Sequence, residues 1–385
     1  MPKAKILIVF GTRPEAIKLA PVIELLRADE RFSVTVVSTG QHREMLSQVT
    51  DLFGFKPDID LGLMHRKQPL NRILSRSLKG LDPILKSVKP DAVIVQGDTS
   101  TAAAAALAAF NRQSKVVHLE AGLRSHNLDS PFPEEANRKI ISAISSLHLA
   151  PTANARDNLI AEGIDPDIVA VTGNTVIDAL YRVSSTEPSF VNDSIAEALE
   201  RFPRRIIFTS HRRENLASLR AFGSAISELS ALFPESAFFL PLHLNPKIRK
   251  RLLPELTDIE NVITIPPLAY NEFVGLMRVS DLIVTDSGGV QEEAPALNIP
   301  ALLIRDTTER PEAIEAGAVR MISPSAHTIV KEVCHLLNDD SAYSQMKQAK
   351  NPFGDGRAAD RVIDAIATAL GIQDQRQIDE FSYLP

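Results

Sequence analysis

A regular alternation of short apolar runs with longer helical patterns constrains the fold more than any other feature of the sequence. Six such runs occupy the first half of the chain, at residues 5–11, 34–40, 91–98, 116–122, 147–152 and 168–174. They are rich in Val, Ile and Leu on both faces, which is typical of buried parallel strands. The helix expected at residues 14–27 begins with Thr12 and Glu15 in capping-box spacing. The chain therefore opens with a predicted βαβ unit.

The same pattern restarts in the second half, at residues 204–211, 237–243, 261–268, 281–289, 300–306 and 318–323. We therefore predict an α/β protein with two Rossmann-like doubly wound domains, whose sheets have about six strands each and face one another across a cleft. The polar stretch 185–204 marks the boundary. We expect one domain over 1–180, a second over 200–355, and a helix over 356–372 that packs back on the first. The polar residues 371–385 are expected to form a loosely held tail.

Charge and composition exclude several classes of protein. The net charge of −6 and the pI near 5.9 argue against nucleic-acid binding, so an anionic ligand would need local charges and backbone dipoles. Cys334 is the single cysteine and has no intramolecular partner. The start of the chain lacks a signal-peptide pattern, and no apolar run reaches the ~18 residues of a membrane span. We expect a soluble, cytoplasmic protein with no nucleic-acid or membrane partner.

The usual motifs for tightly held cofactors are missing from the sequence. A sheet that binds NAD opens with GxGxxG, because the pyrophosphate needs a close backbone approach. Here the first turn reads GTRPEA, with Gly11 as its single glycine. GxxxxGK[ST] and Cys/His clusters at zinc spacing are missing too. The sequence therefore predicts no cofactor and no metal.

Polar side chains gather at the ends of the predicted strands, where open α/β sheets build their sites. In the first half these are Arg13, Gln41, His42, Asp98 and Glu120. In the second half they are His211, His243 and the segment from Ser287 to Glu293. Both halves are therefore expected to carry functional residues.

The segment TDSGGVQEEAP, residues 285–295, sets Gly288 and Gly289 between a strand and a helix. Glycine N–H groups and the Ser287 hydroxyl can hold a phosphate at a helix N-terminus. An ordinary strand-to-helix turn, with glutamates that complement the helix dipole, accounts for the segment equally well. A nucleotide would explain why carboxylates follow an anion site, because Glu293 can accept hydrogen bonds from ribose hydroxyls one turn further along.

The segment from residue 118 to 138 places Glu120, Glu134, Glu135 and Arg138 around a loop with two prolines. Glu134 and Arg138 are spaced i, i+4, so a surface ion pair worth about 0.3–0.5 kcal/mol is the simpler account of those two residues.

Simple structural accounts also exist for other candidates. Asp98 can be an N-terminal helix cap, and His211 can be a polar residue that merely ends a strand. Arg13 and Lys18 form a basic pair in an acidic chain. Both residues are candidates for phosphate binding. For Lys18 the default account is a charged side chain on the solvated face of the helix.

Eleven motifs follow one another in unbroken order from about residue 5 to 370: GTRPEAIKLAPV, QHREML, QGDTST, HLEAGLRS, PFPEEANR, TGNTVIDAL, SHRREN, PLHLNP, TDSGGVQEEAPALNIP, RDTTERPEA and NPFGDGRAADR. Together they resemble the bacterial UDP-N-acetylglucosamine 2-epimerases of the non-hydrolysing type. The resemblance implies a glycosyltransferase-B-like fold with a deep cleft, a homodimer and a UDP-sugar substrate.

The resemblance also implies a reaction. UDP is eliminated across C1–C2 of the sugar to give a 2-acetamidoglucal, and it is added back after the opposite face has been protonated. This reaction needs no NAD. It does need a base for a weakly acidic proton, an acid for the return, and stabilisation of the departing diphosphate.

Carried over by position, the resemblance assigns catalysis to Asp98, Glu120, Glu134, Arg138 and His211. The carboxylates would share the base and acid work, and the two basic residues would act on the diphosphate or orient the acids.

The resemblance assigns UDP binding to Arg13, Lys18, Phe273, Ser287, Gly288 and Glu293. Phe273 would pack on uracil, Ser287 and Gly288 would hold phosphate, and Glu293 would hold ribose. Gln41 and His42 are candidates for a second, activating UDP-sugar site.

Two positions depart from the family pattern. Ser210 precedes His211 where glycine is common, and Gln96 stands in QGDTS where histidine is also found. The first limits the backbone near His211, and the second changes the hydrogen bonding beside Asp98.

The resemblance leaves alternatives open. Close relatives act on other UDP sugars, including UDP-2,3-diacetamido-glucuronic acid, and hydrolysing relatives release N-acetylmannosamine and UDP. A glycosyltransferase of the same fold and a non-catalytic UDP-sugar sensor are more distant alternatives. The paired acids Glu120 and Glu134 are hard to explain in the transferase.

Overall fold

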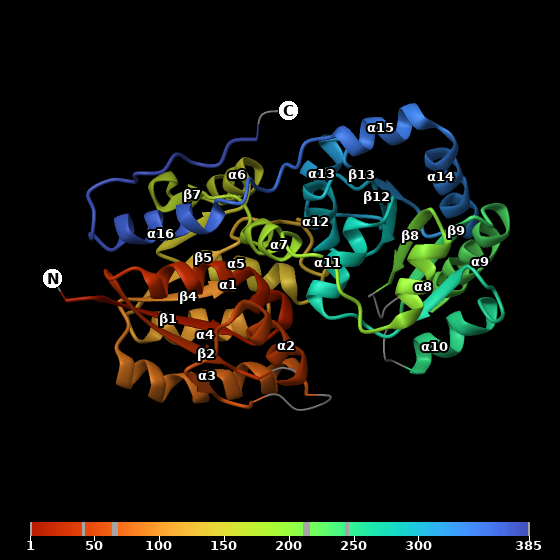
Figure 1. The fold of residues 1–385 in the computed structure, drawn as a ribbon. Helices are drawn as coiled ribbons and strands as arrows, with labels where there is room; N and C mark the ends of the chain where they lie inside the picture. Colours follow the sequence, from red (N-terminus) through yellow and green to blue (C-terminus); the bar gives the residue numbers. More distant parts are fainter. Residues whose placement is uncertain (1, 41–42, 64–67, 211–215, 243–245, 384–385) are drawn as a thin grey trace. The chain divides into compact units, whose positions relative to one another are not determined.

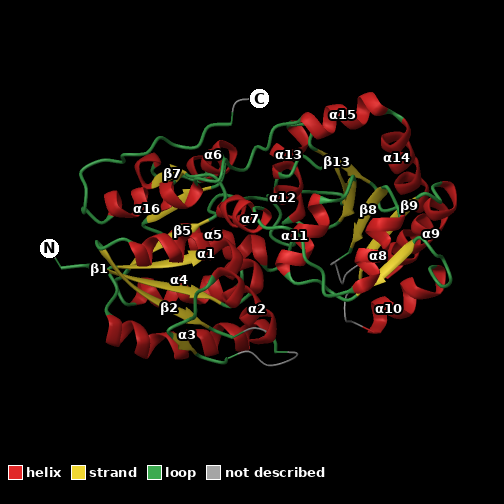
Figure 2. Ribbon diagram, in the orientation of Figure 1, coloured by secondary structure: helices red, strands yellow, loops and turns green. Residues whose placement is uncertain are grey.

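The computed structural model describes residues 2–40, 43–63, 68–210, 216–242 and 246–383. The chain divides into two compact units, Met1–Tyr181 with Phe353–Leu384, and Arg182–Pro352. Each unit is a parallel sheet with helices packed around it (Figure 1, Figure 2).

In the first unit the described strands pair in parallel in the order β3-β2-β1-β4-β5-β6-β7. The strands are β1 (Ala4–Phe10), β2 (Phe32–Ser38), β3 (Ile59–Asp60), β4 (Ala92–Gln96), β5 (Lys115–Leu119), β6 (Leu147–Ala150) and β7 (Val169–Val171). The helices are α1 (Arg13–Ala28), α2 (Arg43–Phe53), α3 (Leu70–Val88), α4 (Ser100–Asn111), α5 (Glu134–Ile144), α6 (Ala153–Ala161), η1 (Pro166–Ile168), α7 (Thr175–Ser184) and α16 (Ala358–Ala369). The strand order reverses between β1 and β4, where open sheets of this kind bind ligands.

In the second unit the order is β10-β9-β8-β11-β12-β13, again all parallel. The strands are β8 (Arg204–Thr209), β9 (Ser236–Pro241), β10 (Val262–Ile265), β11 (Leu282–Thr285), β12 (Ala301–Ile304) and β13 (Val319–Ile322). The helices are α8 (Asp193–Arg201), α9 (Leu216–Leu232), α10 (Pro246–Leu252), η2 (Leu253–Glu255), α11 (Tyr270–Arg278), α12 (Val290–Ala296), α13 (Glu312–Glu315), α14 (Ala326–Asn338) and α15 (Asp340–Gln348). The corresponding reversal lies between β8 and β11.

The helices of the first unit form two layers. Right-handed crossovers place α1 on one face of the sheet and α4 on the other, because β1 leads to β2 in one direction and β4 leads to β5 in the opposite direction. Accordingly α16 packs on α1, and α3 and α5 pack on α4. The run of alanines in α4 is buried from Ala102 to Ala106, and such small side chains let the helix lie close to the strands.

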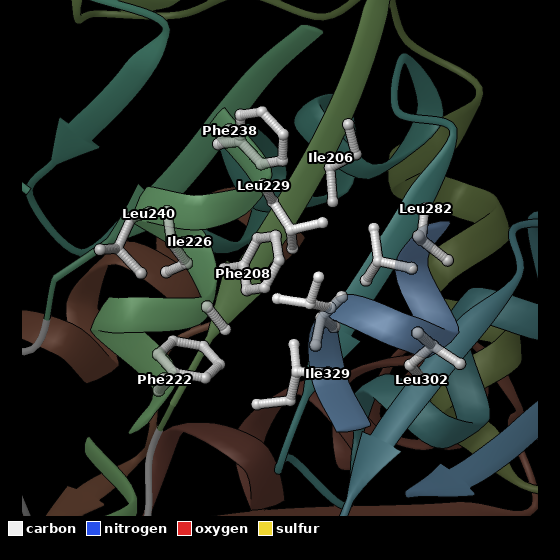
Figure 3. Close-up of a cluster of buried hydrophobic side chains, with 14 of the residues drawn as sticks. Ile206, Phe208, Phe222, Ile226, Leu229, Phe238, Leu240, Leu282, Leu302 and Ile329 are labelled. Atoms are coloured by element: carbon white, nitrogen blue, oxygen red, sulfur yellow. The ribbon is translucent and has the colours of Figure 1, made fainter. Parts of the chain in front are cut away.

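Three aromatic side chains pack together within the largely aliphatic core of the second unit (Figure 3). Phe208 of β8 is fully buried and meets Phe222 of α9 edge to face, with ring centroids 5.4 Å apart. Phe238 of β9 lies on its other side at 6.1 Å. Ile329 of α14 belongs to the same cluster, so helices on this face are fixed to the central strand of the sheet.

The predicted α/β class with two Rossmann-like sheets is confirmed, as is the capping box formed by Thr12 and Glu15 at the start of α1. Sequence patterns missed β3, because a strand of two residues produces no apolar run. No helix in the described part of the chain is long and apolar enough to cross a bilayer.

The prediction of a loosely held C-terminal tail is wrong. Phe381 is buried, and its N–H donates to the carbonyl of Val171 at 2.9 Å. The Asp364 carboxylate of α16 accepts hydrogen bonds from the backbone N–H groups of Gln377 and Ile378. In Figure 1 this blue segment runs back along the first unit. Polar composition was misleading because the backbone makes most of these contacts.

Candidate active site

The carboxylate of Glu120 is the centre of a polar cluster in the first unit. Glu120 directly follows β5 and has a φ of 65°, in the left-handed region that side chains other than glycine rarely adopt. Its Oε1 pairs with Lys18 Nζ and accepts a hydrogen bond from Asn174 Nδ2 at 3.1 Å. Its Oε2 accepts from Gln96 Nε2. The Glu120 side chain is only 9% exposed, so the protein holds this acid in one orientation.

Lys18 is not a solvated helix charge, contrary to the default sequence account. It lies on α1 and is 7% exposed, with its ammonium against Glu120. Arg13, its predicted partner in phosphate binding, is the first residue of the same helix and is half-buried. The Lys18 ammonium is therefore committed to a carboxylate.

Asp98 lies one strand away from Glu120, just after β4. It does not cap the next helix, because the Thr99 hydroxyl accepts the cap hydrogen bond from Ala102 N–H at 3.0 Å. The Asp98 carboxylate instead accepts from Arg138 Nη2 at 2.7 Å and from Arg138 Nε at 2.9 Å, and its carbonyl accepts from Asn137. The carboxylate is therefore held towards α5.

The account of Arg138 as part of a surface ion pair is also wrong. Arg138 is 4% exposed and bridges Asp98 to Glu135, whose Oε2 lies 2.8 Å from Arg138 Nη1. Glu135 also accepts hydrogen bonds from the N–H groups of Ser125 and His126, so it fixes the loop that connects β5 to α5. Glu134, the first residue of α5, is half-buried.

Opposing influences act on the Glu135 carboxyl. Burial favours its neutral form, but hydrogen bonds from the Ser125 N–H and Arg138 outweigh burial and lower its pKa. The group is therefore ionised and structural.

Glu15 ties the start of α1 to the start of α4. Its carboxylate accepts from the N–H groups of Gly11 and Thr12 at 2.9 and 2.6 Å, and from the Thr99 hydroxyl at 2.6 Å. Burial raises its pKa, and the hydrogen bonds from Thr99 and Gly11 only partly oppose that effect. The capping residue thus also joins the turns that leave β1 and β4.

Two buried histidines face each other on β5 and β6. His118 and His148 are paired in register, and their rings are 6.4 Å apart. Burial lowers the pKa of His118 to about 3 and that of His148 to about 4. Both are neutral near pH 7, and His118 Nε2 lies 2.8 Å from the Gly97 carbonyl.

In the second unit the turn after β11 combines serine, glycines and buried charges. Ser287 and Gly288 are half-buried, and the Ser287 N–H donates to the Thr285 hydroxyl at 3.0 Å. A Cβ added to Gly288 would lie 3.1 Å from Arg310 Nη1, so a guanidinium lies directly beside this turn. The turn therefore offers small residues next to a cation.

The two glutamates after the turn have separate partners. Glu292 is fully buried, and its Oε1 accepts from Arg310 Nε at 2.6 Å. Glu293 Oε1 accepts from the Tyr270 hydroxyl at 2.9 Å. Tyr270 lies on α11, the helix that also carries the half-buried Phe273. One of the two negative charges is thus neutralised inside the fold.

The segment that follows β12 was quoted as a motif but received no role from sequence reasoning. Arg305 Nε donates to the Asp286 carbonyl at 2.7 Å, and Arg305 Nη1 lies 3.1 Å from Glu309. Thr308 donates to Gln291 at 2.8 Å, and Arg310 also pairs with Glu309. This segment therefore holds the turn after β11 in place. Its two arginines in an acidic chain were the signal that was overlooked.

The structure brings Lys18 together with Glu120, and Asp98 together with Arg138. Glu15, Gln96 and Asn174 belong to the same region, although only Gln96 was linked to it by sequence reasoning, and then as a neighbour of Asp98. Four predicted residues lie outside the described ranges: Gln41, His42, His211 and His243. Within the residues that the structure describes, no three His, Cys, Asp or Glu side chains are grouped as a metal ion would require.

Comparison with known proteins gives consistent matches over the chain. A family model described as UDP-N-acetylglucosamine 2-epimerase matches residues 24–367. A probable UDP-N-acetylglucosamine 2-epimerase of Ralstonia nicotianae is 47% identical over 368 residues, covering 94% of this chain and 98% of the relative.

Solved structures agree with this match. That of a putative UDP-N-acetylglucosamine 2-epimerase from Listeria monocytogenes has a TM-score of 0.95 and 43% identity, with 100% of both chains covered. The enzyme from Neisseria meningitidis, bound to UDP-GlcNAc, has a TM-score of 0.88 and 43% identity, covering 94% of this chain and 100% of that chain.

Proposed function

The chain belongs to the UDP-N-acetylglucosamine 2-epimerase family, and from this membership we propose that it interconverts UDP-N-acetylglucosamine and UDP-N-acetylmannosamine without NAD. The observation that carries the proposal is the Glu120 carboxylate, which is held beside Lys18 at the end of β5, one strand from Asp98. A proton-transfer reaction at carbon needs an acid and a base whose surroundings set their pKa values, and carboxyl groups can serve as both.

The proposed reaction has two stages. A base takes the proton from C2 while the C1–O bond breaks, which gives a 2-acetamidoglucal and UDP. An acid then protonates C2 from the opposite face while the UDP oxygen re-forms its bond to C1. Atoms and charge balance over the cycle, and no oxidant or reductant is required.

Asp98, Glu120 and Glu134 are proposed to share the base and acid work. The buried contact of Arg138 with Asp98 supports an orienting role for this arginine. Two donors of one planar guanidinium hold the Asp98 carboxylate in a single direction, which suits a base. His211, which lies outside the described residues, is proposed to act on the diphosphate.

UDP is proposed to bind through Arg13, Lys18, Phe273, Ser287, Gly288 and Glu293. Ser287 and Gly288 are proposed to hold phosphate, and their place beside the Arg310 guanidinium supports this. The hydrogen bond from Tyr270 orients the Glu293 carboxylate, which supports a role in accepting ribose hydroxyls. Phe273, half-buried on α11, is proposed to pack on uracil.

Proton and phosphorus NMR with UDP-N-acetylglucosamine in D2O, without NAD, tests the reaction. UDP-N-acetylmannosamine with deuterium at C2 is the expected product. Free UDP with N-acetylmannosamine would instead indicate a hydrolysing enzyme. An unchanged spectrum would overturn the proposed substrate, and UDP-2,3-diacetamido-glucuronic acid would then be tried. Asp98→Asn and Glu134→Gln should lose turnover and still bind UDP, whereas a sensor would keep its response.

We further propose a cytoplasmic homodimer, with catalytic acids in an N-terminal domain (1–180) and UDP contacts mainly in a second domain (200–355). Light scattering of the purified protein tests the dimer, and a monomeric mass at micromolar concentration would contradict it. Cell fractionation tests the location.

A further inference from the structure

Glu120 receives a hydrogen bond from Asn174, a residue to which sequence reasoning gave no role. Asn174 belongs to the turn between β7 and α7 and is 2% exposed. Its Nδ2 donates to Glu120 Oε1 at 3.1 Å, on the same oxygen that faces Lys18. An amide N–H that donates to a carboxylate stabilises its ionised form and fixes the direction of the carboxylate group.

The second half of the Asn174 side chain has a separate task. Its Oδ1 accepts from the Val176 N–H at 3.1 Å, which closes the turn that starts α7. Because the acceptor and the donor of one amide serve different partners, substitution can remove one interaction and keep the other.

The backbone of Asn174 is anchored by the returning C-terminal segment. Its N–H donates to the Phe353 carbonyl at 2.7 Å, and Phe353 is fully buried. The next turn is anchored as well, because the Asp178 carboxylate accepts from the N–H groups of Ala358 and Ala359 at the start of α16. The amide that meets Glu120 is thus fixed from the other end of the chain.

We propose that Asn174 is a positioning residue for Glu120, and that the segment beginning at Phe353 supports it. The proposal rests on the proposed catalytic role of Glu120. The strained backbone at Glu120 gives the side chain a direction, and the amides of Asn174 and Gln96 set its rotation and favour its ionised form.

Asn174→Asp is the sharpest test, because it keeps an acceptor for Val176 and replaces the donor to Glu120 by a second carboxylate. We expect kcat to fall about 10–100-fold with KM changed less than about 3-fold, since the residue orients an acid and does not bind substrate. The apparent pKa of whichever limb of the pH–rate profile reports Glu120 should rise by at least about one unit.

Asn174→Ala loses the donor without adding charge and should shift the limb less than Asn174→Asp does. Asn111→Asp, the same change at the exposed end of α4, is the matched control and should behave as the wild type. If Asn174→Asp is too slow to give a profile, the Asn174→Ala profile decides the question. UDP binding by calorimetry shows that each variant is folded.

The proposal is overturned if the pH–rate profile and kcat of Asn174→Asp match those of Asn111→Asp. Glu120→Gln separates this result from failure of the proposed function. Wild-type turnover in Glu120→Gln would remove the catalytic role of Glu120 itself, whereas an inactive Glu120→Gln with an unshifted, active Asn174→Asp would remove only the role of Asn174.

Discussion

Each unit contains a buried glutamate near the point where its strand order reverses, and the two glutamates are held in different ways. Glu120 of the first unit meets a lysine and two neutral amides, from Gln96 and Asn174. Glu292 of the second unit meets the guanidinium of Arg310, which also pairs with Glu309. The first acid combines neutral donors with a lysine, whose charge can change when it is buried, whereas the second has an arginine partner whose charge is permanent.

The difference explains how carboxylates can have opposite tasks in one fold. A carboxyl group that transfers protons must exist in both its ionised and its neutral form, and neutral amide donors favour the ionised form less strongly than a guanidinium does. A carboxylate that secures a turn gains from a planar guanidinium with several donors. The two glutamates that follow the turn after β11 therefore have different tasks. Glu292 stabilises the turn, and Glu293 is proposed to bind the nucleotide.

The largest effect is expected for Glu120→Gln. The amide keeps the volume of the side chain but cannot take or give the proton, so kcat should fall by about 10²–10⁴-fold. UDP affinity should change little, because nucleotide contacts are proposed mainly in the second unit. NMR turnover assays and calorimetry measure the two quantities, with Glu30→Gln, an exposed change in the same unit, as the control. Equal turnover in the two variants would show that Glu120 takes no part in proton transfer.

A stability effect is expected for Arg310→Ala. Its loss leaves Glu292 as a fully buried charge without its guanidinium, which costs about 3–5 kcal/mol of unfolding free energy. Arg320→Ala is the control, because its pair with Glu332 is partly exposed and should contribute about 0–1 kcal/mol. Urea unfolding gives both values. If Arg310→Ala costs no more than Arg320→Ala, Glu292 is not the structural member of the pair.

The strands and their ends could be predicted because parallel strands buried on both faces produce apolar runs. Asp98, Glu120 and Ser287 come one or two residues after strands β4, β5 and β11, so their position at the carboxyl edges followed from the pattern. The motifs then indicated which of these polar residues match the site residues of one enzyme family.

The partners of those residues could not be predicted, because they are set by the topology. Lys18 and Glu120 are separated by 102 positions, and they meet because β1, β4 and β5 are neighbours in the sheet. Asn174 meets Phe353 only because the chain returns to the first unit. Local spacing instead favoured a surface pair for Arg138, which lies buried against Asp98 and Glu135.

A smaller effect tests whether the partner or the unit decides how a carboxylate behaves. Arg124, whose side chain is fully buried, donates from Nη2 and Nε to the two oxygens of Glu162 in the first unit, at 2.7 and 3.0 Å. Hydrogen bonding to this arginine lowers the pKa of Glu162 to about 2 from the ordinary value of 4.5. Since the folded pKa is the lower one, the stabilisation is complete above pH 4.5 and is lost as pH falls towards 2.

Because Glu162 is partly exposed, solvent screening reduces the expected contribution to about 1 kcal/mol. Glu162→Gln lowers stability at neutral pH and removes this part of the pH dependence, so its unfolding free energy should fall less steeply than that of the wild type between pH 4.5 and 3. Urea unfolding across that interval measures the slope, with Glu30→Gln again as the control. Parallel slopes for wild type and Glu162→Gln would mean that an arginine partner does not fix the charge of a carboxylate in this unit. The contrast between Glu120 and Glu292 would then reflect the unit and not the chemistry of the partner.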